Sequence, residues 1–301
     1  MTSLHNLRSS QTPFPIPVVA ALGPGGMVED ETLDYLSMPQ GMAQYQPPVL
    51  PEPEELAACA GAVRVLGQVR DALHQVSSSA EPQRDTVRVL LQGLSSADLL
   101  LLNQVLGEGE VSAQLLSADG APVLQIQESV FAGVWRVLGL SPEGQALDYI
   151  EVGAVPEALR TAALADGQSP APAAGPVPAQ LMNVPSVLVE LEDQRRSWRS
   201  GDLAHVVNLT LLPLTPQDIA YLDYRLGTGR VLILSRGYGN CRITNCCVPN
   251  TWRVVYYNSM DTVILNSVEV TDMPEVACAA PEDLRDSAER VQDVLKWVQQ
   301  G

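Results

Sequence analysis

Three of the chain's five cysteines, Cys241, Cys246 and Cys247, lie within the stretch SRGYGNCRITNCCVPNTWRVVYY. Thiolates grouped in this way can bind a metal ion, exchange disulfides or hold an iron–sulfur cluster. In a straight strand, however, neighbouring side chains face opposite ways, and Cys241 and Cys247 would stand roughly 20 Å apart. Zinc–sulfur bonds measure only about 2.3 Å. We therefore interpret these cysteines first as small buried residues of a strand Cys241–Val248. The second interpretation is a redox or cluster-binding role for Cys241 together with Cys278, and the third is zinc binding.

Other catalytic patterns are missing from the sequence. The three histidines are scattered, and there is no HExxH, GxSxG, P-loop or paired CxxC motif. One acidic pair, Asp98 and Asp218, occurs at matching places, but a position near a helix start explains both residues without catalysis. The sequence thus predicts no catalytic residue, no metal ligand and no cofactor, and we expect a protein that is not an enzyme.

The charge limits the partners that we expect. The 301 residues carry a formal net charge of −17. This argues against nucleic acid and against an anionic membrane surface, and it suits a partner with basic segments. No apolar run is long enough to span a membrane, and prolines interrupt the N-terminal apolar residues. We therefore expect a cytoplasmic protein.

The chain repeats itself. The stretch LSSADLLLLNQVLGEGEV from Leu94 matches LTPQDIAYLDYRLGTGRV from Leu214, and Trp135-Arg136-Val137 matches Trp252-Arg253-Val254 further along. The spacing between matching residues drifts from 120 to 117 and 118, which small loop deletions would produce. In each copy a strand leads to a capped helix and then to several short strands. The predicted fold class is α+β, a tandem duplication of a unit with a mostly antiparallel sheet and helices packed on one face.

The expected organisation has four parts. Residues 1–50 form a Pro-rich acidic extended arm, 51–160 the first repeat unit, 161–182 a Pro/Ala-rich linker and 183–301 the second unit. The duplicated tryptophans are expected in the core. The arginines beside them should then face the other way, and we expect Arg136 to pair with Glu151 and Arg253 with Glu269.

The motifs FPIPVVAALGPG, GEGEVS, ESVFAGVWRV, LSRGYGNCRIT and EVACAAPEDLRDSAER occur in this order over nearly the whole chain. With them the sequence resembles the HupH/HyaF family of hydrogenase expression/formation proteins. The resemblance implies a non-enzymatic chaperone for maturation of nickel–iron (NiFe) hydrogenase. It further implies action on the iron–sulfur small subunit before its export by the twin-arginine route, beside a thioredoxin-like HupG/HyaE-type accessory protein. The alternative is an iron or iron–sulfur scaffold or repair factor that uses Cys241 and Cys278.

The most distinctive motif of the family resemblance falls on a turn. We expect the partner-binding residues here, at Gly237, Tyr238, Gly239, Asn240, Cys241 and Arg242. Turn chemistry accounts for the glycines and the asparagine, which tolerate positive φ. It does not account for an exposed tyrosine beside an arginine, and these two residue types are common anchors of binding sites. At the matching place the first copy has an ordinary polar turn, 117–120.

Overall fold

The computed structural model describes residues 59–141, 144–168, 178, 181–237 and 239–300. Its strands form one ten-stranded sheet with the order β1-β5-β4-β3-β2-β7-β8-β9-β10-β6, and each neighbouring pair is antiparallel. The predicted arm, 1–50, lies outside the described residues.

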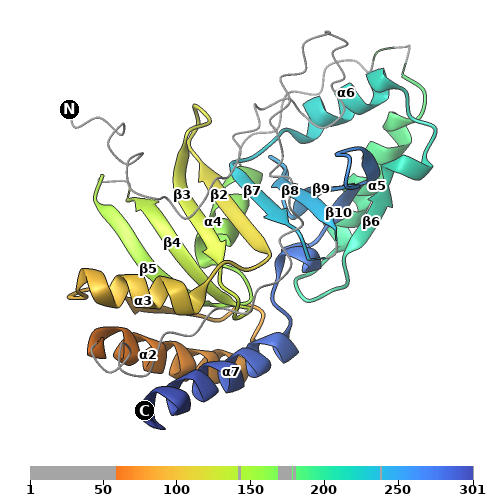
Figure 1. Cartoon of the computed structure of the whole chain (residues 1–301). Helices are drawn as coiled ribbons and strands as arrows, with labels where there is room; N and C mark the ends of the chain where they lie inside the picture. Colours follow the sequence, from red (N-terminus) through yellow and green to blue (C-terminus); the bar gives the residue numbers. More distant parts are fainter. Residues whose placement is uncertain (1–58, 142–143, 169–177, 179–180, 238, 301) are drawn as a thin grey trace.

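Both halves of the chain contribute equivalent elements (Figure 1). The first half contains α2 (Ala60–Ser77), β1 (Thr86–Leu90), α3 (Ser96–Leu106), β2 (Val111–Leu116), β3 (Pro122–Glu128), β4 (Val134–Leu140), β5 (Ala146–Gly153) and α4 (Glu157–Gly167). The second half contains α5 (Val184–Ser197), β6 (His205–Asn208), η2 (Leu209–Leu211), α6 (Pro216–Leu226), β7 (Val231–Ser235), β8 (Asn240–Asn245), β9 (Thr251–Tyr257), β10 (Val263–Val270), η3 (Glu275–Ala277) and α7 (Pro281–Gln300). Equivalent strands have the same order in both halves, so the α+β tandem duplication is confirmed.

The two units join through β2 and β7. These strands are equivalent in the duplication, and they pair antiparallel with Ala113 opposite Ile233. Those two residues occupy matching positions, 120 apart in the chain. A local twofold axis therefore passes between them, and the two units form one continuous sheet.

Helices cover both faces of this sheet, but at different places. In the first unit α2 and α3 pack on one face over a core that includes Ile150 and Val152, and α5 and α6 do the same in the second unit. This matches the expected layer of helices in each unit. On the opposite face Leu159 of α4 packs at the junction with Trp135 and Trp252, both completely buried, as predicted for the core.

Two segments cross from one unit to the other. Helix α7 follows the second unit but packs against α2 of the first, as Figure 1 shows. Its entry is fixed by the Ala279 N–H, which donates to the Ala154 carbonyl at 2.9 Å. Helix α4 makes the opposite crossing, with Asp166 accepting from the backbone N–H of Arg230 at 2.8 Å. Because α4 continues to Gly167, the predicted linker 161–182 begins inside a helix whose Ala162 is buried.

The duplicated arginines face away from the tryptophans, as expected, but the predicted partners are wrong. Arg136 Nε donates to Asp148 Oδ1 at 2.6 Å, and Arg253 Nη1 lies 3.4 Å from Asp223 Oδ1. The reason is the strand register. Glu151 lies opposite Trp135 and Glu269 opposite Trp252, so both glutamates share the face of the tryptophans.

The helix starts follow the predicted capping chemistry. Thr215 accepts from the Asp218 N–H and Asp218 accepts from the Thr215 N–H, a complete capping box, and Ser95 with Asp98 repeats it. Asp218 also accepts from the backbone N–H of Met182 at 3.1 Å and of Val184 at 3.3 Å. Its carboxylate therefore ties the start of α5 to the start of α6.

The pKa of this carboxyl has an expected effect on acid stability. Burial pushes the pKa of Asp218 upward, but the hydrogen bonds from Thr215, Val184 and Met182 outweigh it and hold the pKa at about 2. Because the folded-state pKa is depressed, the stabilisation is complete above pH ~4 and is lost as the pH falls towards 2.

We predict that Asp218→Ala lowers the free energy of unfolding at pH 7 by about 1–3 kcal/mol, since several backbone donors lose their acceptor. The variant should also lose less stability than the wild type between pH 4 and 2. Urea unfolding followed by circular dichroism at several pH values measures both effects. The control is Asp193→Ala, an exposed acid on α5, and an equal loss in the two variants would contradict the prediction.

Candidate functional site

The turn between β7 and β8 lies at the junction of the two units. The Arg236 N–H donates to the Glu110 carbonyl at 3.1 Å. A Cβ added to Gly237 would lie 2.1 Å from Glu110 Oε2, so a larger residue here would displace this exposed side chain. Gly239 has a φ of +104°, a conformation that favours glycine. Gly237 and Gly239 are exposed, whereas Tyr238 lies outside the described residues.

Strand β8 separates the remaining predicted site residues. Cys241 faces the junction core and is almost fully buried, and Arg242 faces the other side of the sheet and is half-buried. Asn240 begins the strand, opposite Tyr257. Among the described residues of the predicted set, Gly237 and Gly239 are exposed and Arg242 is half-buried, whereas the Cys241 thiol is buried.

The two thiols proposed for redox or iron chemistry share one core. Cys241 belongs to the junction core and Cys278, after η3, packs against it. Burial raises the pKa of each thiol to about 12, and Cys278 Sγ donates to the Pro274 carbonyl at 3.6 Å. Both groups are therefore uncharged thiols at neutral pH, and thiolates are the form that attacks disulfides or binds metal.

The remaining clustered cysteines support the packing interpretation. Strand β8 ends at Asn245, before Cys246 and Cys247, so the predicted strand Cys241–Val248 is too long. Cys246 is nevertheless buried, between α5 and α6. Cys247 packs under Gly227 as Val130 packs under Gly107, and in each case a Cβ added to the glycine would lie 2.9 Å from the side chain below it. Within the described part of the chain, no group of three or more His, Cys, Asp or Glu side chains is placed to hold a metal ion.

A buried glutamate lies beneath the same junction, and the sequence reasoning missed it. Glu128 Oε1 accepts from the Gly133 N–H at 3.0 Å, and the Glu128 carbonyl accepts from the Gly109 N–H at 2.7 Å. The pKa of Glu128 is raised to about 7, mainly by burial and also by the nearby carboxylates of Glu110 and Asp283, both exposed, against the hydrogen bond from Gly133. Residues from several of the family motifs thus meet around Glu128.

In the second unit, the residues around Asn245, which is equivalent to Glu128, have balanced charges. Asp166 Oδ1 accepts from Arg230 Nε at 2.8 Å, and Asp166 Oδ2 accepts from Asn245 Nδ2 at 3.0 Å. By the duplication, Arg230 and Asn245 correspond to Glu110 and Glu128, and Asp283 of α7 lies near Glu128 as Asp166 of α4 lies near Asn245. The first unit therefore has three acids where the second has an acid, a base and an amide. Aligning the two copies at these positions is the signal that could have found Glu128.

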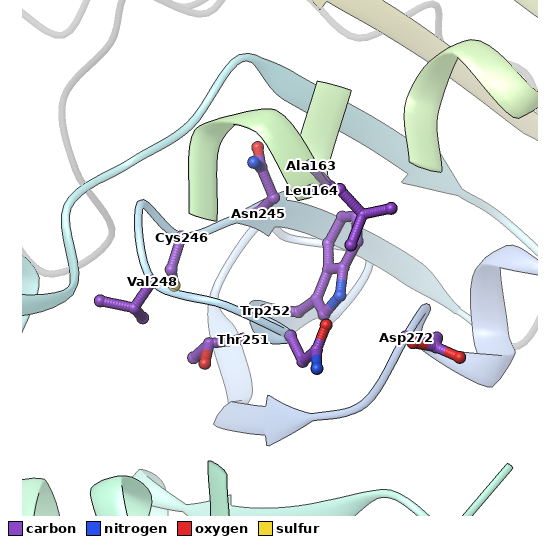
Figure 2. Close-up of a pocket in the computed structure, with 9 residues that line it drawn as sticks. Ala163, Leu164, Asn245, Cys246, Val248, Thr251, Trp252 and Asp272 are labelled. Carbon is purple, nitrogen blue, oxygen red and sulfur yellow. The ribbon is translucent and has the colours of Figure 1, made fainter. Parts of the chain in front are cut away.

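The junction also contains a small pocket, shown in Figure 2, between α4, the ends of β8 and β9 and the segment after β10. Its lining consists of Ala163, Leu164, Asn245, Cys246, Val248, Asn250, Thr251, Trp252 and Asp272. Asp272 is already paired with Arg84 at 2.8 Å, and burial raises the pKa of the Cys246 thiol to about 12. The lining therefore contains no nucleophile beside a base. None of the described helices is both long and apolar enough to cross a membrane.

Comparison with known proteins adds a family to this geometry. The family model described as HupH hydrogenase expression protein, C-terminal conserved region, matches residues 59–170 and again 181–298. The chain is 57% identical over 285 residues to the hydrogenase expression/formation protein HoxQ of Cupriavidus necator, a match that covers 95% of this chain and 98% of that protein. It is 42% identical over 286 residues to HupH of Rhodobacter capsulatus, with the same coverages. It is 31% identical over 278 residues to the hydrogenase-1 operon protein HyaF of Escherichia coli, covering 92% and 95%.

The buried glutamate generates a prediction for stability against pH. The folded-state pKa of Glu128 is raised, to about 7. Folding stability therefore falls as the pH rises from about 4.5 to 7 and is level above that. Glu128→Gln keeps an acceptor for the Gly133 N–H without the charge. We expect it to raise the free energy of unfolding at pH 8 by on the order of 3 kcal/mol, and to change it little at pH 4.

Denaturant unfolding of wild type and variant from pH 4 to 8 measures this difference. Glu110→Gln is the matched control, because it removes the same charge from an exposed position and should change stability by less than about 0.5 kcal/mol. A difference between wild type and Glu128→Gln that is the same at every pH would contradict the assignment.

Proposed function

Because this chain belongs to the HupH family of hydrogenase expression/formation proteins, we propose that it is a non-enzymatic chaperone for maturation of a NiFe hydrogenase. Its target is the iron–sulfur small subunit before export from the cytoplasm, and it works beside a thioredoxin-like accessory protein of the HupG/HyaE type. The relatives' names support the hydrogenase role. The target and the chaperone mechanism are inferred from the resemblance and from the chemistry of the junction.

The observation that carries the proposal is that exposed Gly237 approaches the carboxylate of Glu110, an acid that lies near buried Glu128. A chain of net charge −17 attracts basic segments over a long range. The turn lies near Glu110, which together with Asp283 of α7 is close to Glu128. A small-subunit precursor carries a basic twin-arginine signal. Complementary charge would speed its encounter with the chaperone and select against acidic competitors.

We predict that the tagged protein recovers the small-subunit precursor and the thioredoxin-like protein from hydrogenase-expressing cells. Recovery should fall as salt rises from 50 to 500 mM, because salt screens exposed charges. Tyr238→Ala combined with Arg242→Ala should lower both recovery and hydrogenase activity several-fold with the fold intact by circular dichroism. The mirror variant Asp119→Ala with Gln125→Ala alters the equivalent hairpin of the first unit and should do little. A wild-type protein that recovers no small subunit, or a folded Tyr238/Arg242 variant with normal activity, would reject the proposal.

The alternative function, an iron or iron–sulfur scaffold built on Cys241 and Cys278, has less support. Both thiols are held in the neutral form by burial, and a cluster needs thiolates on accessible side chains. We expect anaerobic reconstitution with iron and sulfide to leave less than one iron per chain, equally for wild type and Cys241→Ser. Stoichiometric iron in the wild type that is lost in Cys241→Ser would establish the alternative instead.

A further inference from the structure

The duplication supplies an internal comparison for one buried arginine. In the first unit, Arg136 lies under α3 and is fully partnered. Its Nε and Nη2 donate to the two carboxylate oxygens of Asp148 at 2.6 and 2.9 Å, and its Nη1 donates to Asn103 Oδ1 at 3.1 Å. A planar guanidinium and a carboxylate match each other in this two-point contact. In the first unit, the guanidinium group on this strand therefore has hydrogen-bond acceptors for all three of its nitrogens.

The equivalent arginine of the second unit lacks such an acceptor. Arg253 is only 4% exposed, and none of its three guanidinium nitrogens makes a hydrogen bond with any described residue. Asp223 of α6 lies 3.4 Å from Nη1 without completing one. The position of Asp148 is taken by Asn266, as the register shows: Asp148 lies opposite Leu138, and Asn266 opposite the matching Val255. Asn266 Oδ1 is likewise buried and without a partner among the described residues.

A second substitution adds positive charge at the same place. Arg242 occupies the position that Gln125 has in the first unit. It lies opposite Val255, whose other neighbour is Asn266, so Arg242 and Asn266 flank one residue on the same face of the sheet. The Arg242 guanidinium stands over the ring of Tyr257, 5.9 Å from its centroid. The strand residue Asp148 is replaced by Asn266, and the helix residue Asn103 by the carboxylate of Asp223. The number of acids on this face is therefore unchanged, and Arg242 is an added cation.

Burial makes this arrangement costly. A buried guanidinium that completes no hydrogen bond loses its hydration, and the ion pair of Arg253 with Asp223 at 3.4 Å compensates for this only in part. Burial lowers the pKa of Arg253 and raises that of Asp223, and their mutual attraction opposes both shifts without cancelling them. The Arg253–Asp223 pair thus does not replace the two-point contact of the first unit. The half-buried Arg242 is close enough to Arg253 to lower the pKa of Arg253 as well.

We propose that the second unit binds a carboxylate supplied by a protein partner, beside Asn266, the residue that replaces Asp148 of the first unit. Arg242 meets the carboxylate at the surface, and Arg253 lies beneath it. The chemistry fits an Asp or Glu side chain or a chain-terminal carboxylate. This inference shares Arg242 with the proposed partner-binding hairpin, but it concerns the face of the sheet opposite the junction core. Asn266→Asp, which lies outside that hairpin, tests it separately from the proposed function.

The test uses the purified full-length chain and three short peptides. One is blocked at both ends and contains a single Glu, one is neutral in its side chains with a free C-terminal carboxylate, and one is blocked and contains Gln in place of Glu. Calorimetric titration should show saturable binding of at least one carboxylate peptide and none of the Gln peptide. Which of the first two binds identifies the source of the carboxylate.

Two variants locate the site. Arg242→Gln installs the residue of the first unit, and Asn266→Asp supplies an internal carboxylate for Arg253. Each should weaken binding at least tenfold. Asn266→Asp should also raise the melting temperature, because it restores the pairing seen for Arg136, and this rise shows that the loss of binding is not unfolding. Arg196→Gln removes the same charge from an exposed position on α5 and should leave binding unchanged.

Several results would overturn the inference. They are equal binding of the Gln peptide, no binding of either carboxylate peptide, unchanged affinity in Asn266→Asp, or a melting temperature of Asn266→Asp at or below that of the wild type. Inorganic phosphate is a further probe. Binding of phosphate without binding of a carboxylate peptide would assign the face to a different class of ligand and reject the proposal.

Discussion

The pairing of β2 with β7 is the constraint on which the rest of the structure depends. In either unit alone this strand would be an edge with unpaired backbone groups, which soluble proteins must cover or pair. Here equivalent strands satisfy each other around a local twofold axis, with Ala113 opposite Ile233. The tryptophans of both units then share one buried layer at the junction. A shared core of this kind leaves neither unit complete without the other.

The crossing helices follow from this arrangement. Helix α4 leaves the first unit and contacts the second through Asp166, and α7 leaves the second and completes the helical layer of the first. Each crossing helix contributes one acid near the sheet: Asp166 of α4 accepts from the Arg230 N–H just before β7, and Asp283 of α7 lies near Glu128 at the end of β3. The twofold symmetry of the backbone therefore produces two similar sites, one around Asp166 and one around Asp283, whose side chains differ.

Divergence between equivalent positions is where the chemistry of this protein lies. At the junction, the first unit collected carboxylates around Glu128, while the second kept a balanced set around Asn245. On the opposite face, the first unit kept a satisfied Arg136, while the second has Arg253 without an acceptor among the described residues. Each unit thus serves as the structural reference for the other. Residues that both units share are explained by the requirements of folding. Residues that differ between the units are candidates for a role in binding.

The sequence by itself determined the duplication, the α+β class and the capped helices, because periodicity, caps and turns are local. It also determined that Cys241 and Arg242 face opposite sides of one strand. It mispaired Arg136 and Arg253, because cross-strand partners depend on a register that adjacent residues do not fix. Only the tertiary structure decided that α7 returns to the first unit, that Glu128 is buried near Glu110 and Asp283, and that burial keeps Cys241 and Cys278 in the thiol form. Burial and charge proximity join residues over a hundred positions apart, and no local pattern encodes them.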